Sequence, residues 1–228
     1  KTGVMYCWGG HMRPTYILLN WTDDLRSVRT LAHEMGHAIH SEYSKVQNVF
    51  HEQYSIACAE IASTLFENFV FEKLLDKLSP IDSLYARFNR LQESVAIVFR
   101  NAAFFQFELD IHNASATTGY ITSEQFVDFM KHRLQEYLGK AVTVHHDDGY
   151  LWVRHMHARW FFYVYSYSFG ALISNELYAR YKTDKNFIHS INQFLQSGGS
   201  DTPENILKKL GIEKKKKNFW KNNLDLID

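Results

Sequence analysis

The segment H-E-M-G-H, residues 33–37, places the strongest constraint on how this chain folds. It lies inside residues 23–44, a run whose sequence reads as one helix. Residues i and i+4 lie one above the other on a helix face, so the imidazoles of His33 and His37 converge on one point. Two such nitrogens suit a zinc ion, and Glu34 between them reaches the same space. The pattern predicts metal-assisted hydrolysis with Glu34 as general base.

A third ligand is expected, because a catalytic zinc usually has three protein ligands and a water. The next helical run, residues 54–78, holds Glu60 among small apolar neighbours. A carboxylate there is costly unless it is paired or bound to a metal, and the small side chains let two helices approach closely. We therefore predict Glu60 as the third ligand. The weaker candidates are His40, His51, Glu52 and Glu67.

Four sequence blocks support a family resemblance. They are Y-I-L-L-N-W from Tyr16, H-E-M-G-H-A-I-H-S from His33, A-E-I-A-S from Ala59, and W-V-R-H-M-H-A-R-W-F-F-Y-V-Y-S-Y-S-F-G from Trp152. The chain resembles oligoendopeptidase F, in the thimet oligopeptidase family of zinc peptidases, from residue 1 to about residue 197. His40 favours this family over zinc carboxypeptidases that carry a tyrosine at that position.

The resemblance implies roles for particular residues. His33, His37 and Glu60 would bind one zinc ion, and Glu34 would activate the water. His157 falls at the family's substrate-contacting histidine, and the nearest matches to its catalytic tyrosines are Tyr163 and Tyr165. These groups would stabilise the oxyanion of the tetrahedral intermediate. One departure stands out: Arg159 occupies the position two residues after that histidine, where a tyrosine is expected.

The N-terminal stretch predicts a strand beside the metal helix. Gly9 and Gly10 mark a turn, and residues 16–21, beginning at Tyr16, form a β-rich apolar run. An edge strand can bind an extended peptide through main-chain hydrogen bonds, and glycines allow its backbone to approach. We expect Gly9, Gly10 and Tyr16 to contact substrate. The alternative is a hairpin with a structural role alone.

The rest of the chain reads as mostly helical. Pro80 follows a Ser79 N-cap and opens an apolar-periodic run to about residue 112, and Thr122 to Gln125 fits a capping box. Further helices are expected around residues 165–181 and after Thr202. The predicted fold is mainly α: a zincin-type helical catalytic domain with a small β-sheet or hairpin near the N-terminus. One domain, 1–228, would comprise a substrate-side strand region (1–22), the zinc-site helices (23–197) and a helical tail (198–228).

Composition limits the partners. Lys plus Arg and Asp plus Glu both number 25, so neither nucleic acid nor an anionic membrane is implied. The two cysteines make no disulfide framework, and neither a signal peptide nor an apolar run of about 20 residues is evident. We therefore expect a cytoplasmic location. Short peptides as substrates are what the family resemblance implies.

The resembled family carries a large helical region upstream that forms the other wall of a deep channel. We therefore expect this chain to be the C-terminal catalytic part of a longer protein. Apolar faces that normally contact the missing N-terminal region could then drive self-association. On this hypothesis the isolated chain binds zinc but cleaves peptides poorly.

Two other classes of function stay open. One is a catalytically weak or inactive zinc-binding fragment or scaffold that lacks the N-terminal half of the channel. The other is a helical interaction module in which H-E-x-x-H is accidental. Within the enzyme class, an exopeptidase would need a charged residue to fix a substrate terminus, and Arg154 or Arg159 could serve.

Overall fold

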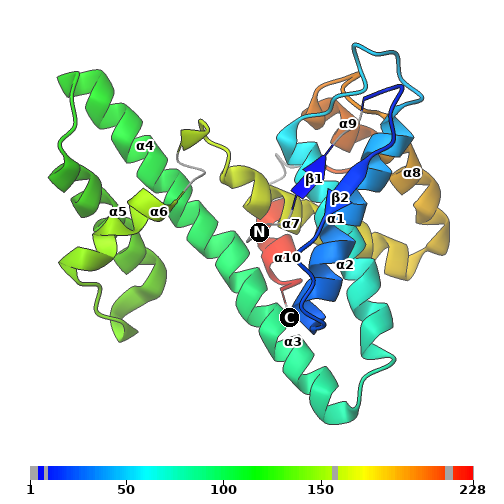
Figure 1. Cartoon of the computed structure of the whole chain (residues 1–228), viewed down its shortest axis with the longest axis horizontal. Coiled ribbons are helices and arrows are strands. Elements are labelled where there is room, and N and C mark those ends of the chain that lie inside the picture. The colour runs from blue at the N-terminus through cyan, green and yellow to red at the C-terminus, as the bar shows by residue number, and fades with distance from the viewer. Residues whose placement is uncertain (1–4, 8–9, 156–158, 214–217, 228) are drawn as a thin grey trace. The chain divides into compact units, whose positions relative to one another are not determined.

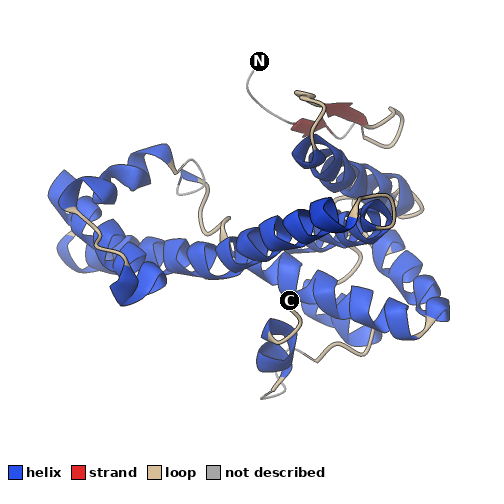
Figure 2. Cartoon of the chain, turned by 90° about the horizontal axis from the view of Figure 1, so that it is seen from below, coloured by secondary structure: helices blue, strands red, loops and turns tan. Residues whose placement is uncertain are grey.

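A computed structural model of the chain describes residues 5–7, 10–155, 159–213 and 218–227. These residues are mainly helical, with one small sheet (Figures 1 and 2), as the sequence predicts. The elements, in chain order, are β1 Met5–Cys7, β2 Tyr16–Leu18, α1 Leu25–Ser44, α2 Ile56–Leu75, α3 Pro80–Val95, η1 Ala96–Arg100, α4 Asn101–Thr118, α5 Ser123–Leu138, η2 Gly139–Ala141, η3 His146–Tyr150, α6 Leu151–Arg154, α7 Tyr165–Thr183, η5 Lys185–Phe187, α8 Ile188–Gln196, α9 Pro203–Lys209 and α10 Phe219–Leu224.

The predicted β-structure is an antiparallel pair of short strands. Tyr6 on β1 lies opposite Ile17 on β2, and Gly10 in the connection has a φ of 79°. That left-handed conformation suits glycine, which has no Cβ to clash. The strand β2 is shorter than the apolar run 16–21 suggested, since it ends at Leu18. The sheet belongs with α1, because the Tyr6 hydroxyl hydrogen-bonds to Ser41 Oγ.

The chain divides into two compact units. Unit 1 comprises residues 1–92 and 169–228, and unit 2 comprises residues 93–168. The core of unit 1 lies where α2 meets α7, α8 and α9, and its fully buried side chains include Ile61, Leu65, Ile173 and Ile191. Burial of these aliphatic groups is the main term that stabilises such a core. The helices α1 and α2 then carry the predicted metal ligands on the face beside this core.

Both metal-site helices begin with a side-chain cap. The Asp24 carboxylate accepts a hydrogen bond from the Ser27 backbone N–H (2.6 Å), and the Ser55 hydroxyl accepts one from Cys58 N–H (3.3 Å). Each cap satisfies a donor that the first helical turn leaves without a partner. The helices start two residues after the expected positions, because Asp24 and Ser55 serve as caps.

Unit 2 is built on α4 and α5. Phe107 and Met130 are fully buried between these helices, and Arg133 makes a two-pronged salt bridge to Asp110 (2.7 and 2.8 Å). The Thr122–Gln125 capping box predicted from the sequence is present. The π-helical turn η1 separates α3 from α4, so the single predicted run after Pro80 contains one irregular turn and ends later, at Thr118.

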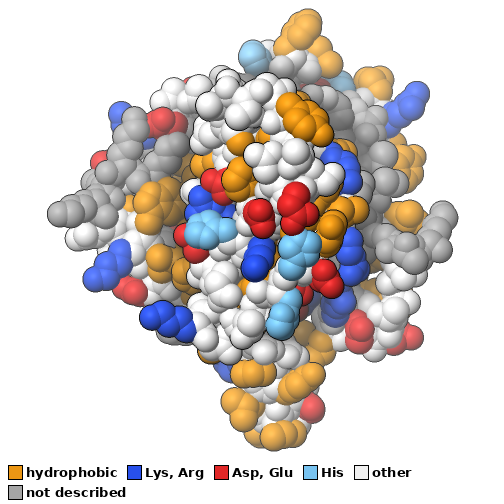
Figure 3. Space-filling view, turned by 90° about the vertical axis from the view of Figure 1, so that its left-hand side faces the viewer, with side chains coloured by type: hydrophobic (Ala, Val, Ile, Leu, Met, Phe, Trp, Pro, Cys, Tyr) orange, Lys and Arg blue, Asp and Glu red, His pale blue; other side chains and the backbone are white. Residues whose placement is uncertain are grey.

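The surface shows no strong bias of charge in the view of Figure 3, where acidic, basic and histidine side chains are intermixed. This agrees with a formal net charge of zero for the whole chain. Among the helices that the structure describes, none is long and apolar enough to cross a membrane.

Candidate metal centre

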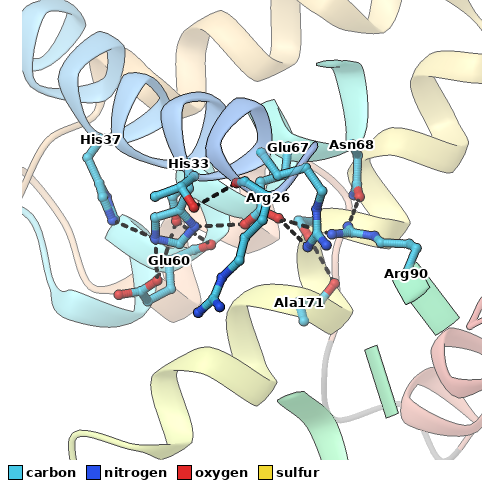
Figure 4. A network of polar contacts seen from close by, with 12 residues as sticks. Arg26, His33, His37, Glu60, Glu67, Asn68, Arg90 and Ala171 are labelled. Atoms are coloured by element: carbon cyan, nitrogen blue, oxygen red, sulfur yellow. Dashed lines mark hydrogen bonds and ion pairs between the residues drawn. The ribbon is translucent and has the colours of Figure 1, made fainter. Parts of the chain in front are cut away.

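The helix α1 brings the two predicted histidine ligands together. His33 and His37 are one turn apart, and their Nε2 atoms are 3.2 Å from each other. Figure 4 shows both rings on the same side of α1. His33 has a partly exposed side chain, and His37 is 9% exposed. The spacing of four residues therefore produces the convergence that the motif predicts.

The helix α2 supplies Glu60. Its Oε2 is 3.6 Å from His33 Nε2, and one donor atom from each of His33, His37 and Glu60 lies within 4.8 Å of the others. These three residues form a group that could hold a metal ion, and two imidazoles with a carboxylate are a donor set that suits zinc. Glu60 is 2% exposed, so it is not an ordinary solvated glutamate.

Two glycines allow the helices to approach closely enough for this geometry. A Cβ added to Gly36 would lie 2.6 Å from Ser63 Cα on α2, and one added to Gly170 on α7 would lie 2.7 Å from the Glu60 Cβ. Contacts this short are not tolerated between carbon atoms, so glycine is required at both positions. The α1–α2 crossing thus sets the distance between Glu60 and the histidines.

Burial dominates the electrostatics of Glu60 and His37. It raises the pKa of Glu60 to about 7, partly opposed by the charge of His33 and the hydroxyl of Ser63. Burial and the neighbouring His33 lower the pKa of His37 to about 3. Both shifts disfavour the charged form in the absence of a compensating ion. A bound cation would restore the carboxylate, and a neutral His37 is the form that ligates a metal.

Glu67 is a member of the site whose role the sequence interpretation missed. Its Oε1 is 2.8 Å from His33 Nδ1, while its Oε2 accepts hydrogen bonds from Arg29 (3.1 Å) and Arg90 (3.0 Å). Although burial opposes it, these partners lower the pKa of Glu67 to about 2. Glu67 is seven residues after Glu60, and two helical turns place both on one face of α2. That spacing was the available signal.

The structure describes the predicted catalytic base but only some of the predicted substrate contacts. Glu34 lies half-buried on α1, and burial raises its pKa, although the charge of His33 opposes the shift. Tyr163 and Tyr165 belong to unit 2, whereas His33, His37 and Glu60 belong to unit 1. His157 and Gly9 lie outside the described residues. Their predicted roles remain predictions, as do those of Gly10 and Tyr16.

The other weaker ligand candidates have structural partners. His40 is buried and stacks on Tyr54, with ring centroids 3.6 Å apart. Glu52 is buried beside His11 of the loop that joins β1 to β2. The His51 carbonyl accepts a hydrogen bond from the Gly199 N–H (2.7 Å). These contacts give the three residues partners outside the group of His33, His37 and Glu60.

Residues 5–226 match the family model described as peptidase family M3. This chain belongs to peptidase family M3. The resemblance to oligoendopeptidase F is thereby confirmed at the level of the family, over nearly the whole sequence. The crystal structure of oligoendopeptidase-F from Enterococcus faecium covers 89% of this M3 chain with a TM-score of 0.72 at 27% identity, and the match takes in 37% of that protein.

Curated members of the family have similar sequences. Group B oligopeptidase PepB of Streptococcus agalactiae is 31% identical over 219 residues, which are 93% of this chain and 36% of that protein. Oligopeptidase PepF of Bacillus subtilis is 31% identical over 216 residues, 93% of this chain and 32% of that protein. The M3 chain thus spans about a third of the length of the relatives it matches.

Proposed function

We propose that this M3 chain is the catalytic part of a zinc-dependent endopeptidase that hydrolyses short peptides. The observation that carries the proposal is the convergence of His33, His37 and Glu60 from two helices, with donor atoms within 4.8 Å. Bound zinc would polarise the scissile carbonyl and lower the pKa of its water. The names of the relatives PepB and PepF, both called oligopeptidases, support peptides as the substrate class.

Glu34 is the proposed general base. It follows a proposed ligand directly on α1, and it is half-buried. Burial raises its pKa, and a raised pKa suits a carboxylate that must take a proton from water and return it to the leaving amine. Glu60 and Glu67 are less suited to this role, because one faces both histidines and the other already accepts hydrogen bonds on both oxygens.

Substrate would lie along the β1–β2 hairpin. Among the described residues the sheet has only two strands, so the outer edge of β2 has no partner strand and can pair with an extended peptide. We propose Gly9, Gly10 and Tyr16 as substrate contacts on this side. His157 with Tyr163 or Tyr165 would donate hydrogen bonds to the oxyanion.

Metal analysis and peptide cleavage test this proposal together. The purified chain should contain one zinc ion, and a blocked peptide should be cut internally. Glu34→Gln should retain zinc and abolish cleavage, because the variant keeps the proposed ligands and loses the base. Glu72→Gln is the matched control, since Glu72 lies further along α2 and pairs with Lys182 on the surface (3.3 Å). Absence of zinc from the purified chain would refute the proposed enzymatic function. Release of terminal residues alone would indicate an exopeptidase instead of an endopeptidase.

A second candidate is a zinc-binding fragment with weak or no activity. It is favoured by the chain's span of 36% of PepB, because the remaining two thirds of such a protein could complete the channel. The turnover of this chain, compared with that of a longer protein that includes the upstream region, distinguishes the two candidate functions. Equal turnover by both would exclude the weak fragment, and zinc binding without cleavage by the short chain would support it.

A further inference from the structure

The carboxylate of Glu67 lies directly behind the metal-facing edge of His33. The His33 ring has two nitrogens: Nε2 faces Glu60 (3.6 Å) and His37, and Nδ1 faces Glu67 Oε1 (2.8 Å). Figure 4 shows Glu67 on the opposite side of the ring from Glu60. Two carboxylates of α2, two turns apart, therefore hold the two edges of one imidazole.

The second oxygen of Glu67 is occupied by two guanidinium groups. Arg29 from α1 and Arg90 from α3 donate to Oε2 at 3.1 and 3.0 Å, and both side chains are largely buried. Arg90 also donates to the Asn68 side-chain carbonyl, and Asn68 donates to Asn175 on α7 (3.2 Å). Groups from four helices thus fix Glu67. With both oxygens engaged, this carboxylate is poorly placed to act as a ligand itself.

A neutral imidazole carries one proton, and the hydrogen bond at one nitrogen decides which nitrogen has it. A carboxylate acceptor at Nδ1 holds the proton there, so the lone pair is on Nε2, toward His37 and Glu60. The same bond fixes the orientation of the ring, and such outer contacts also increase the basicity of a ligand.

We propose that Glu67 is a positioning residue, which holds His33 in the tautomer and orientation that bind the metal, and that Arg29 and Arg90 hold Glu67. The inference rests on the proposed zinc site. Arg90 would also help to hold α3 in place. Ala86 is the one buried residue of α3 among those described, so the ion pair between Arg90 and Glu67 is an important link from this helix to α2.

Zinc affinity of Glu67→Gln, measured by competition with a chromogenic chelator, tests the proposal. We expect zinc to bind about 10- to 100-fold more weakly than to the wild-type chain. The cobalt-substituted variant should show a changed visible absorption band, since an altered ligand orientation changes the coordination geometry. Glu72→Gln, on the same helix, should match the wild type in both measurements. A folded Glu67→Gln variant with wild-type affinity would overturn the proposal.

A second pair of variants separates positioning from loss of the fold. Glu67→Gln leaves two buried guanidinium groups without their shared carboxylate, which is costly. Arg90→Met and the double variant Glu67→Gln/Arg90→Met both remove one of the two guanidinium groups. These two variants differ from each other only at Glu67. The double variant should bind zinc at least about 10-fold more weakly than Arg90→Met. Equal affinities would refute the role of Glu67, whereas a wild-type chain that binds no zinc would refute the proposed function instead.

Discussion

Glu60 and Glu67 are buried carboxylates on one face of α2, and their partners give them opposite properties. Glu60 faces two imidazoles and a serine hydroxyl, so burial prevails and raises its pKa to about 7. Glu67 meets two arginines and His33, which outweigh burial and lower its pKa to about 2. A metal ion would supply the positive charge that Glu60 lacks. The difference explains why one residue is suited to ligation and the other to support.

Another buried glutamate makes the stability of unit 2 depend on pH. Glu108 on α4 is 2% exposed, and burial raises its pKa to about 7, partly opposed by the backbone N–H of Phe162. Between about pH 4.5 and pH 7 the unfolded chain loses this proton before the folded chain does, so the contribution of Glu108 to stability falls as the pH rises. We therefore expect Glu108→Gln to be more stable than the wild type at pH 8, with little difference at pH 4.5.

Chemical denaturation of both proteins across this pH range measures the effect. The difference between variant and wild type isolates Glu108 from the histidines that titrate in both. Asp128→Asn, an exposed position on α5, is the matched control and should show no such trend. A variant that is less stable than the wild type at every pH would mean that Glu108 makes a favourable contact as a carboxylate.

At the scale of elements, the candidate metal site depends on how closely α1 packs against α2. Gly36 lies between His33 and His37 on the side that meets Ser63, and a Cβ there would also approach the Ala62 carbonyl oxygen at 3.0 Å. We expect Gly36→Ala to push the helices apart, to cost about 1–3 kcal/mol of the free energy of unfolding, and to weaken zinc binding by moving Glu60 away.

Denaturation and chelator competition on Gly36→Ala measure both consequences. Met35→Ala is the matched control, because Met35 is the preceding residue on α1 and is 41% exposed. It changes the same helical turn at an exposed position. Unchanged stability and zinc affinity in Gly36→Ala would show that the crossing can adjust without moving the ligands.

The sequence predicted these elements well where the signal was local. The i, i+4 spacing of His33 and His37 and the capping box at Thr122 depend on neighbours within one or two turns. Glu60 could be chosen because its small apolar neighbours implied burial. The role of Glu67 depends on Arg90, which is 23 residues away on another helix, and no local pattern indicates that pair. The π-helical turn η1 was missed for a related reason, since its residues 96–100 continue an apolar periodicity.

At the scale of the whole molecule, α3 presents a row of apolar side chains to solvent. Ile81, Leu84, Tyr85 and Phe88 are each more than half exposed, and their spacing of three and four residues places them on one side of the helix. Exposed apolar surface of this kind marks an interaction site or a tendency to associate. In a longer M3 protein, the upstream region could cover this face, which we advance as a proposal.

For the chain by itself, we expect this α3 face to cause self-association that increases with protein concentration. The formal net charge of zero provides no long-range repulsion to oppose it. Leu84→Gln/Phe88→Gln should shift the equilibrium toward monomer, because each buried apolar side chain contributes about 1.5–3 kcal/mol when two faces meet. Sedimentation velocity over a range of concentrations measures the shift. Phe50→Gln/Tyr120→Gln is the control, since these two residues are at least as exposed but lie in separate units. A wild-type chain that stays monomeric at high concentration, or a control that dissociates as readily as the α3 variant, would contradict the assignment of this face.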